Sequence, residues 1–588
     1  MKKFVVGALV VLGLLAIMGT MAVGALLMVS LMARPNVPGN TILEIDFERG
    51  TIESIPPDPF AELMLKGVLP LRDVVDALDR AAVDDRVQGL VARIGAGGMG
   101  MAHTQEIRDA VSRFRASGKP AVAWGETFGE FASGNGGYYL ATAFDEIYLQ
   151  PSGDVGLTGL IYQSPFLREA FEKLEISPRM DQRYEYKNAM NMYTERSFTE
   201  PHREALERLM DSQFDQMVAG IAAGRGLDEG AVRALVDRGP FLGEEAVTEG
   251  LVDGLRYRDE VIAMMKERAG ARARLLYLPA YLERAERPHR RGETVALVHA
   301  HGTVVRGGSG YSPLDGSVIM GSDTVGAALR AAIDDDAVRA ILLRVDSPGG
   351  SYVASDTIWH ETRRAREAGK PVVVSMGNLA ASGGYFVSMS ADKIVAQPGT
   401  ITGSIGVLGG KLVTRDFWGK LGITFDEVHT SANATAWSTI DDYSERGYQR
   451  FQDSLDRIYD DFTAKVAEGR ELPVERVREI ARGRIWTGAD AKELGLVDEI
   501  GGYAEALDLV RETLMLEAED PLKIRVFPRK RGALEQWLGQ EPDSSENAVA
   551  VLAAELLRTV QPAVRVLRQA GIGEPVHALE TRDVGPRP

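Results

Sequence analysis

The chain of 588 residues contains no cysteine. Disulfide bonds, thiolate catalysis and cysteine-based zinc sites are therefore excluded. It also lacks any excess of positive charge, because 84 acidic residues outnumber 67 basic ones and the formal net charge is −17. Proteins that bind nucleic acids usually present basic surfaces, so a nucleic acid is not the expected main partner.

Signatures of nucleotide and metal chemistry are also missing. The sequence has no Walker loop and no His-Glu-x-x-His motif, so we expect neither a cofactor nor a metal. His299 and His301 share one face of a predicted strand, but no third ligand motif lies nearby. A Ser-His-Asp triad stays formally open with eight histidines, although none stands in a turn motif like those described below.

One long apolar run stands at the N-terminus. Lys2 and Lys3 precede an uncharged stretch over 4–33, which ends at Arg34. About 20 apolar residues suffice to span a bilayer. Because Leu31 occupies a position where a cleavage site needs a small residue, we expect an uncleaved signal anchor. Residues 1–3 would then stay cytoplasmic and the remainder would be exported.

The sequence repeats itself internally. Tyr138–Pro151 aligns without a gap on Tyr385–Pro398, a shift of 247 residues. A chain of this length also exceeds what one hydrophobic core usually supports. We interpret the repeat as a domain duplication. The expected parts are an N-terminal lobe at 40–267, a linker at 268–293, a C-terminal lobe at 294–515 and a tail at 516–588.

Each copy alternates apolar strands with helical segments. In the second copy the pattern predicts strands at Val295–Val298, Ala340–Val345 and Val372–Ser375, and helices at Thr324–Asp334, at Ser351–Glu367 and from about Ala381. Buried strands separated by helices are typical of parallel βαβ units. The predicted fold class is therefore α/β, with two similar lobes.

Two glycine-rich turns in the second copy carry candidate chemistry. Ser382 lies in Ala-Ala-Ser-Gly-Gly, between a predicted strand and a helix, where unpaired N–H groups favour developing negative charge. The N–H of Gly383 is a natural oxyanion donor. Asp346-Ser-Pro-Gly-Gly350 follows another strand, and Gly349 is the second expected donor. Taken singly, these motifs could equally be a tight helix cap and a common turn.

Each copy lacks a candidate catalytic residue that the other copy has. At the shift of 247, Ser382 falls on Asn135 and Lys187 falls on Ala434, which suggests one composite site. A buried lysine with a lowered pKa can act as the base for a serine, although isolated lysines are usually exposed. Ser404, in Thr-Gly-Ser-Ile-Gly, offers a hydroxyl that could hold the lysine or merely cap a helix.

The alignment of the first copy leaves one alternative open. Residues 124–135 are four longer than their counterparts, and a two-residue slip would match Ser133 with Ser382. We prefer Asn135 because the 14 residues that follow need no gap.

These motifs, in this order and over a duplication, resemble the signal peptide peptidase A family of membrane-bound bacterial Ser/Lys peptidases. The resemblance covers about residues 1–510 and implies a ClpP/crotonase-like fold. It implies that Ser382 is the nucleophile, Lys187 the general base and Ser404 its orienting group, with Gly349 and Gly383 forming the oxyanion hole. It also implies a bowl-shaped homotetramer that cuts leftover signal peptides at the outer face of the inner membrane. Asp346 departs from the family, where Asn is commoner.

Two other functions remain as alternatives. A crotonase-like enzyme acting on acyl-thioesters would use similar glycine turns, but an exported chain would rarely meet coenzyme A. A non-catalytic membrane scaffold of the same fold is the second, since one copy has lost its serine. The sequence leaves open the cleavage preference, the role of the tail, and whether the serine and lysine pair within one chain or between chains.

Overall fold

The computed structural model describes residues 36–528, except 57–58, 96–97, 271 and 313–315. The expected signal anchor at 4–33 and the tail beyond residue 528 lie outside the described residues. Within the described part of the chain, no helix is both long and apolar enough to cross a membrane.

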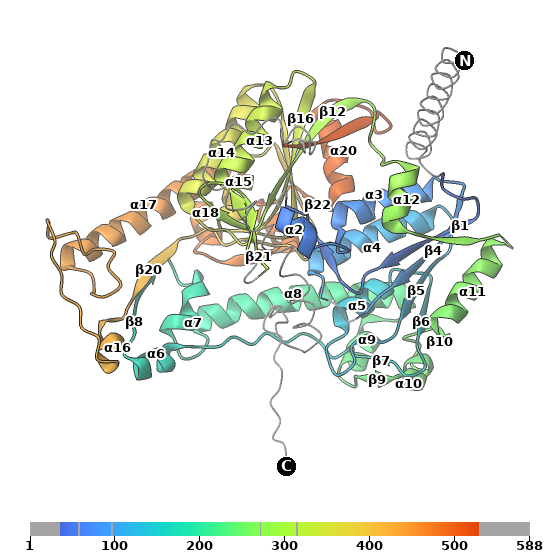
Figure 1. The fold of residues 1–588 in the computed structure, drawn as a ribbon, viewed down its shortest axis with the longest axis horizontal. Helices are drawn as coiled ribbons and strands as arrows, with labels where there is room; N and C mark the ends of the chain where they lie inside the picture. Colours follow the sequence, from blue (N-terminus) through green and yellow to red (C-terminus); the bar gives the residue numbers. More distant parts are fainter. Residues whose placement is uncertain (1–35, 57–58, 96–97, 271, 313–315, 529–588) are drawn as a thin grey trace, which may run out of the picture.

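Two similar α/β lobes form the body of the protein (Figure 1). Each lobe contains a sheet with six parallel strands, and these share one order, β10-β6-β5-β4-β1-β11 in the first lobe and β22-β18-β17-β16-β12-β23 in the second. The second sheet also contains β19 (Ile401–Gly403), beside β17, and β21 (Ile485–Thr487), which runs antiparallel to β19. The first set comprises β1 (Thr41–Asp46), β4 (Val87–Arg93), β5 (Ala121–Gly125), β6 (Glu146–Leu149), β10 (Gly254–Leu255) and β11 (Arg274–Tyr277). The second comprises β12 (Glu293–His301), β16 (Val338–Ser347), β17 (Val372–Ala381), β18 (Lys393–Ala396), β22 (Glu499–Ile500) and β23 (Leu522–Phe527). The predicted duplication of an α/β unit is confirmed, and it fits a ClpP-like fold.

Amphipathic helices cover the sheets. In α3 (Leu71–Ala82), buried Leu71, Val74 and Leu78 recur at helical spacing and face the core. The other main covering helices are α4 (Met101–Ala116), α13 (Ser322–Asp334), α14 (Tyr352–Glu367) and α20 (Tyr503–Thr513). The strands and helices predicted in the second copy are present, but β17 continues six residues further than expected, to Ala381.

Both lobes extend further than the sequence predicted. The expected linker contains β11, which pairs with β1, and α12 (Leu278–Ala285). The expected tail contains β23, which pairs with β12. Both strands lie at sheet edges, where charged side chains are tolerated. Arginine and lysine interrupt the apolar residues of β11 and β23, so the sequence shows no continuous apolar run that would predict a strand.

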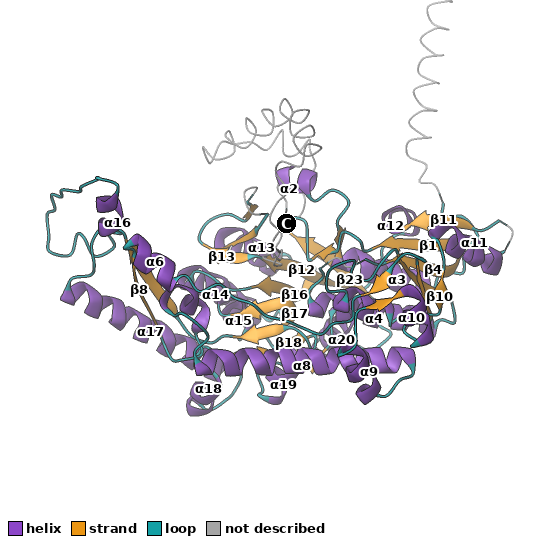
Figure 2. Ribbon diagram, turned by 90° about the horizontal axis from the view of Figure 1, so that it is seen from below, coloured by secondary structure: helices purple, strands orange, loops and turns teal. Residues whose placement is uncertain are grey.

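The first copy also reaches across to the second. Its strand β8 (Ser177–Gln182) pairs antiparallel with β20 (Leu408–Val413) of the second copy. The long helix α8 (Glu200–Arg225) then runs back beneath both lobes, as Figures 1 and 2 show. Residues 183–199, between β8 and α8, are thereby held against the second lobe.

A buried cluster of charges joins the lobes elsewhere. Arg344, in the middle of β16, is fully buried. Its guanidinium lies 2.9 Å from a carboxylate oxygen of Glu53 and 2.9 Å from one of Glu106, both in the first lobe. Breaking such a buried pair leaves an uncompensated charge, which typically costs about 3–5 kcal/mol. The lobes are therefore fixed relative to one another by electrostatics as well as by apolar contact.

Candidate active site

Ser382 stands between the end of β17 and α15 (Gly383–Ser388). Its φ of 56° lies in the left-handed region that side chains other than glycine rarely adopt. Two backbone hydrogen bonds hold it there: its N–H donates to the Gly403 carbonyl at 2.9 Å, and its carbonyl accepts from the Phe386 N–H at 2.9 Å. Strained serines in well-supported turns cluster at functional sites.

Ser404 is brought beside Ser382 by strand register. β19 (Ile401–Gly403) runs parallel to β17, and Ala381 is paired with Gly403. The next residue on each strand is a serine, and neighbouring strands lie roughly 4.8 Å apart. The two hydroxyl residues therefore meet at the carboxyl edge of the sheet.

Lys187 enters this edge from the first copy. After β8, the Arg183 N–H donates to the Val407 carbonyl at 3.0 Å, and the Tyr186 N–H donates to the Arg482 carbonyl at 3.2 Å. Gly483, with φ of 82°, lies directly against the lysine backbone. A Cβ at Gly483 would come within 2.4 Å of the Lys187 Cβ. The path of the lysine therefore requires glycine at 483.

The lysine nitrogen contacts both serines. Lys187 Nζ lies 3.1 Å from Ser382 Oγ, 2.9 Å from Ser404 Oγ and 2.7 Å from the Ser404 carbonyl oxygen. The residue is 6% exposed, and no carboxylate among the described residues forms an ion pair with it. Burial alone lowers its pKa from 10.5 to about 7. The structure brings all three residues together within one chain.

The two predicted glycines are packed backbone against backbone beside Ser382. A Cβ at Gly349, whose φ is 102°, would lie 2.7 Å from the Gly383 nitrogen and 2.7 Å from the Ser382 Cβ. The Gly349 N–H donates to Ser347 Oγ at 3.1 Å. The Gly383 N–H, in the first turn of α15, has no acceptor among the described residues. A side chain at Gly349 or at Gly383 would push the Asp346–Gly350 turn away from Ser382.

The first lobe contains the counterpart of this site without its chemistry. Asn135 begins α5 (Asn135–Ala141), as Ser382 immediately precedes α15, and its side chain bonds to both Ser133 and Gly159. The equivalent hydroxyls of Tyr138 and Tyr385 donate to the Leu251 and Leu496 carbonyls. These matching bonds support the ungapped alignment of Asn135 with Ser382.

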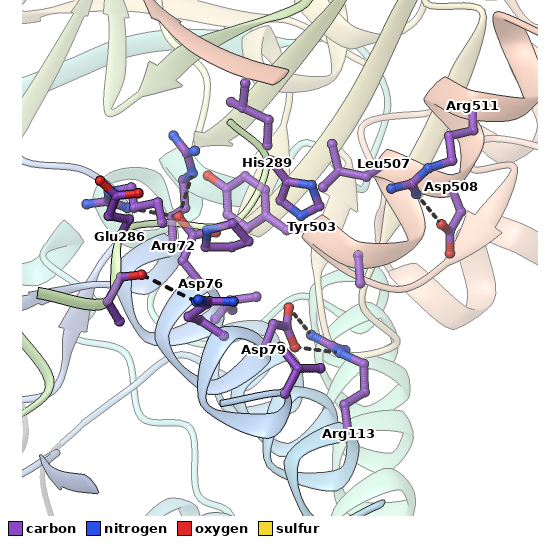
Figure 3. Close-up of a pocket in the computed structure, with 18 residues that line it drawn as sticks. Arg72, Asp76, Asp79, Arg113, Glu286, His289, Tyr503, Leu507, Asp508 and Arg511 are labelled. Atoms are coloured by element: carbon purple, nitrogen blue, oxygen red, sulfur yellow. Dashed lines mark hydrogen bonds and ion pairs between the residues drawn. The ribbon is translucent and has the colours of Figure 1, made fainter. Parts of the chain in front are cut away.

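A cavity of about 420 Å³ lies between α3 and α20, at the joint of the lobes (Figure 3). Charged side chains dominate its lining and largely pair with each other, as in Arg113 with Asp79 and Arg511 with Asp508. None of the five predicted site residues lines it. It is therefore separate from the serine–lysine site.

Sequence reasoning missed the charge cluster around Arg344. The one signal available was an arginine inside an otherwise apolar buried strand, since such a charge needs a buried partner. The partners, Glu53 and Glu106, lie more than 200 residues away, and nothing in the sequence pointed to them.

One protein family and several of its members are similar to this chain. The model of "Peptidase family S49" matches residues 113–272 and 364–517, one region in each lobe. "Protease 4" of Haemophilus influenzae is 31% identical, over 76% of this chain and 73% of its own length. "Protease 4" of Salmonella typhi is 33% identical, over 76% and 72%. "Serine protease SPPA, chloroplastic" of Arabidopsis thaliana is 30% identical, over 78% and 67%.

The fold, the serine at the sheet edge and these similarities define a serine protease. The chain belongs to peptidase family S49, in its long, duplicated signal peptide peptidase A form.

Replacing Gly483 tests whether the close packing around the lysine matters. We expect Gly483→Ala to displace Lys187 and lower kcat on a peptide substrate about 100-fold, because a shift near 1 Å in a catalytic group can have that effect. The matched control is Gly369→Ala. Its φ of 76° imposes similar backbone strain, but no atom lies within 4 Å of the added Cβ. Equal activity of the two variants, with equal melting temperatures, would contradict this account of the glycine.

Proposed function

We propose that the chain is an endopeptidase in which Ser382 is the nucleophile and Lys187 the general base. The observation that carries the proposal is the 3.1 Å separation of Ser382 Oγ from a buried lysine nitrogen that has no carboxylate partner in the described chain. A neutral amine beside a serine hydroxyl is a competent base.

Ser404 gives the lysine its orientation. A neutral amine has two N–H bonds and one lone pair. If both N–H groups donate to the carbonyl and hydroxyl oxygens of Ser404, at 2.7 and 2.9 Å, the lone pair is left for Ser382. The serine O–H then donates to Nζ and loses its proton as Oγ attacks the peptide carbonyl.

The glycines would stabilise the charge that develops. As Oγ bonds to the carbonyl carbon, negative charge moves to the carbonyl oxygen. The N–H groups of Gly383 and Gly349 are the nearest candidate donors, and the Gly349 N–H would exchange its 3.1 Å bond to Ser347 for the oxyanion. Lys187 then protonates the leaving amine, and water activated by the same lysine releases the acyl group from Ser382.

We further propose that the substrates are apolar signal peptides, cut at the outer face of the bacterial inner membrane. The uncharged run at 4–33 supports a membrane anchor, which would hold the site close to such peptides. Flotation of the full chain with lipid vesicles, compared with a chain lacking residues 1–35, tests the anchor. Equal recovery of both in the lipid fraction would oppose it.

We also propose that the chain forms a homotetramer, as the family resemblance implies. The loop that carries α16 (Arg415–Lys420) stands away from the body in Figures 1 and 2. Leu421, Val428 and Trp437 on this loop are each more than half exposed, at 60%, 102% and 67%. Exposed apolar groups in one region favour a protein partner, here a second copy of the chain. Light scattering of the purified chain measures the oligomer directly, and a monomeric mass would oppose it.

Substituting the dyad tests the reaction. We expect Ser382→Ala and Lys187→Met each to lower kcat on a leucine-rich signal peptide by at least about 1,000-fold, because members of one catalytic unit fail together. Arg363→Met, an exposed residue of α14 with 41% side-chain exposure, is the control and should cut normally.

Three results of that experiment would redirect the assignment. Normal cutting by Lys187→Met would place the base elsewhere. A folded wild-type chain that cuts no peptide would favour the non-catalytic scaffold. Hydrolysis of acyl-thioesters but not of peptides would favour the crotonase-like reaction.

The pH dependence follows from the lysine. Because burial lowers the pKa of Lys187 to about 7, the neutral base forms as pH rises through that value. We expect kcat/KM to increase about tenfold per pH unit below 7 and this rise to end above it, because Lys187 sets the acid limb of the profile and any alkaline fall belongs to another group. A rise centred near 10 would mean that the lysine keeps its ordinary pKa and that the site is wetter than its burial indicates.

A further inference from the structure

The turn that carries Gly349 is held by a residue of the other lobe. Asp346, the first residue of the Asp346–Gly350 turn, accepts the Leu379 N–H through Oδ1 at 2.9 Å. Its second oxygen, Oδ2, lies 3.6 Å from His103 Nε2 of the first lobe. The backbone N–H of His103 also donates to the side chain of Asn378, at 3.1 Å. His103 therefore contacts both strands that frame the turn.

These contacts fall on an irregularity in the sheet. The pairing of β16 with β17 shifts between Val345 and Ser347, where Gly377–Leu379 bulge out of register. A bulge re-aims the residues that follow it, here Ser382 on one strand and the Asp346–Gly350 turn on the other. The carboxylate of Asp346 accepts a hydrogen bond from Leu379 in the bulge, and His103 contacts both Asp346 and Asn378 from the first lobe.

The imidazole is also the balancing charge of a buried cluster. His103 Nε2 lies 3.1 Å from Glu53 Oε2, and a ring nitrogen of His103 and carboxylate oxygens of Glu53 and Asp346 all lie within 4.8 Å of one another. With Glu106, the cluster holds three carboxylates against the single guanidinium of Arg344. The groups that face the cluster from the surrounding elements are Thr51, Glu53, Glu106, His299, Arg344, Asp346 and Tyr503.

The protonated histidine reduces the net charge of these buried groups from −2 to −1. Burial is the largest single influence on His103 and lowers its pKa, and the charge of Arg344 acts in the same direction. The hydrogen bond and attraction from Glu53 and the attraction from Asp346 together outweigh them and raise the pKa of His103 above its usual 6.5. The neighbouring His299 has no such close bond, and burial lowers its pKa to about 4, so it contributes no charge.

We propose that His103 is a positioning residue for peptide hydrolysis: as a cation it holds Asp346, and thereby fixes the Gly349 N–H beside Ser382. The inference rests on the proposed function of that site and adds to it a contribution from the first lobe besides Lys187. Without the positive charge, the carboxylates of Glu53 and Asp346 repel each other across less than 5 Å. The turn then moves away from the serine.

The sign of the pH effect is fixed by this arrangement. Because the folded-state pKa is raised, the cation and its contribution are present at low pH and are lost as pH rises through that pKa. Activity should therefore fall on the alkaline side through His103, while Lys187 sets the acid side.

The test compares His103→Gln, Asp346→Asn and the double variant with wild type, measuring kcat and KM from pH 5.5 to 10. Gln keeps a donor toward Glu53 but carries no charge. We expect His103→Gln to lower kcat about tenfold at pH 7, to leave KM within about twofold, and to lack the alkaline fall. Adding Asp346→Asn removes the repulsion between the carboxylates of Glu53 and Asp346. The double variant should therefore recover most of the kcat that His103→Gln loses. His360→Gln, an exposed histidine on α14, is the matched control.

Four outcomes would contradict the proposed role of His103 or of the site itself. An unchanged kcat and an unchanged alkaline fall in His103→Gln, with wild type active, would overturn the proposal and leave the proposed function intact. Failure of the double variant to recover, with a wild-type melting temperature, would also overturn it. Loss of wild-type activity on EDTA treatment, restored by zinc, would assign Glu53, His103 and Asp346 to a metal instead. An inactive wild type would refute the proposed function itself.

Discussion

The structure depends on the burial of one lysine from the first copy against the strand ends of the second. Removing an ammonium group from water is costly, and no carboxylate in the part of the chain that the structure describes offsets that cost, so the surrounding backbone must hold Lys187 in place. The β8–β20 ribbon, the bonds to Val407 and Arg482 and the bare backbone of Gly483 do so. The same burial that destabilises the cation lowers the pKa of Lys187 to about 7, as the proposed role of a general base requires.

Duplication allowed the two lobes to divide this task. Both retain the sheet order. Both also retain a buried tyrosine on the helix at the site, Tyr138 on α5 and Tyr385 on α15, and its hydroxyl makes the same kind of bond in each lobe. Among the described residues, the second lobe contributes Ser382 and Ser404 at the carboxyl edge of its sheet, and the first lobe sends β8 across and contributes Lys187. Because the proposed dyad takes one residue from each lobe, it requires a fixed placement of one lobe against the other. The buried contacts of Arg344 with Glu53 and Glu106 meet that requirement.

Much of the site could be predicted because its parts lie at strand ends. Ser382, Ser404 and Gly349 each follow an apolar strand, and parallel strands bring their carboxyl ends to one edge. Lys187 was found only by comparing the copies, since nothing local distinguishes it from an exposed lysine. The edge strands β11 and β23 were missed because charged residues flank them. The partners of Arg344 and Asp346 were missed because contacts between lobes leave no periodic signal.

The most direct test of the composite site is to measure the rate at which a fluorophosphonate labels Ser382. Mass spectrometry identifies and quantifies the labelled serine over a range of pH, in wild type and in Lys187→Met. The reagent needs only an activated serine, so it reports the dyad without any assumption about the natural substrate. The account predicts one labelled serine, Ser382, with a rate that rises through pH of about 7, the pKa of Lys187, and that collapses without the lysine. Labelling of another serine, or an equal rate in the variant, would contradict it.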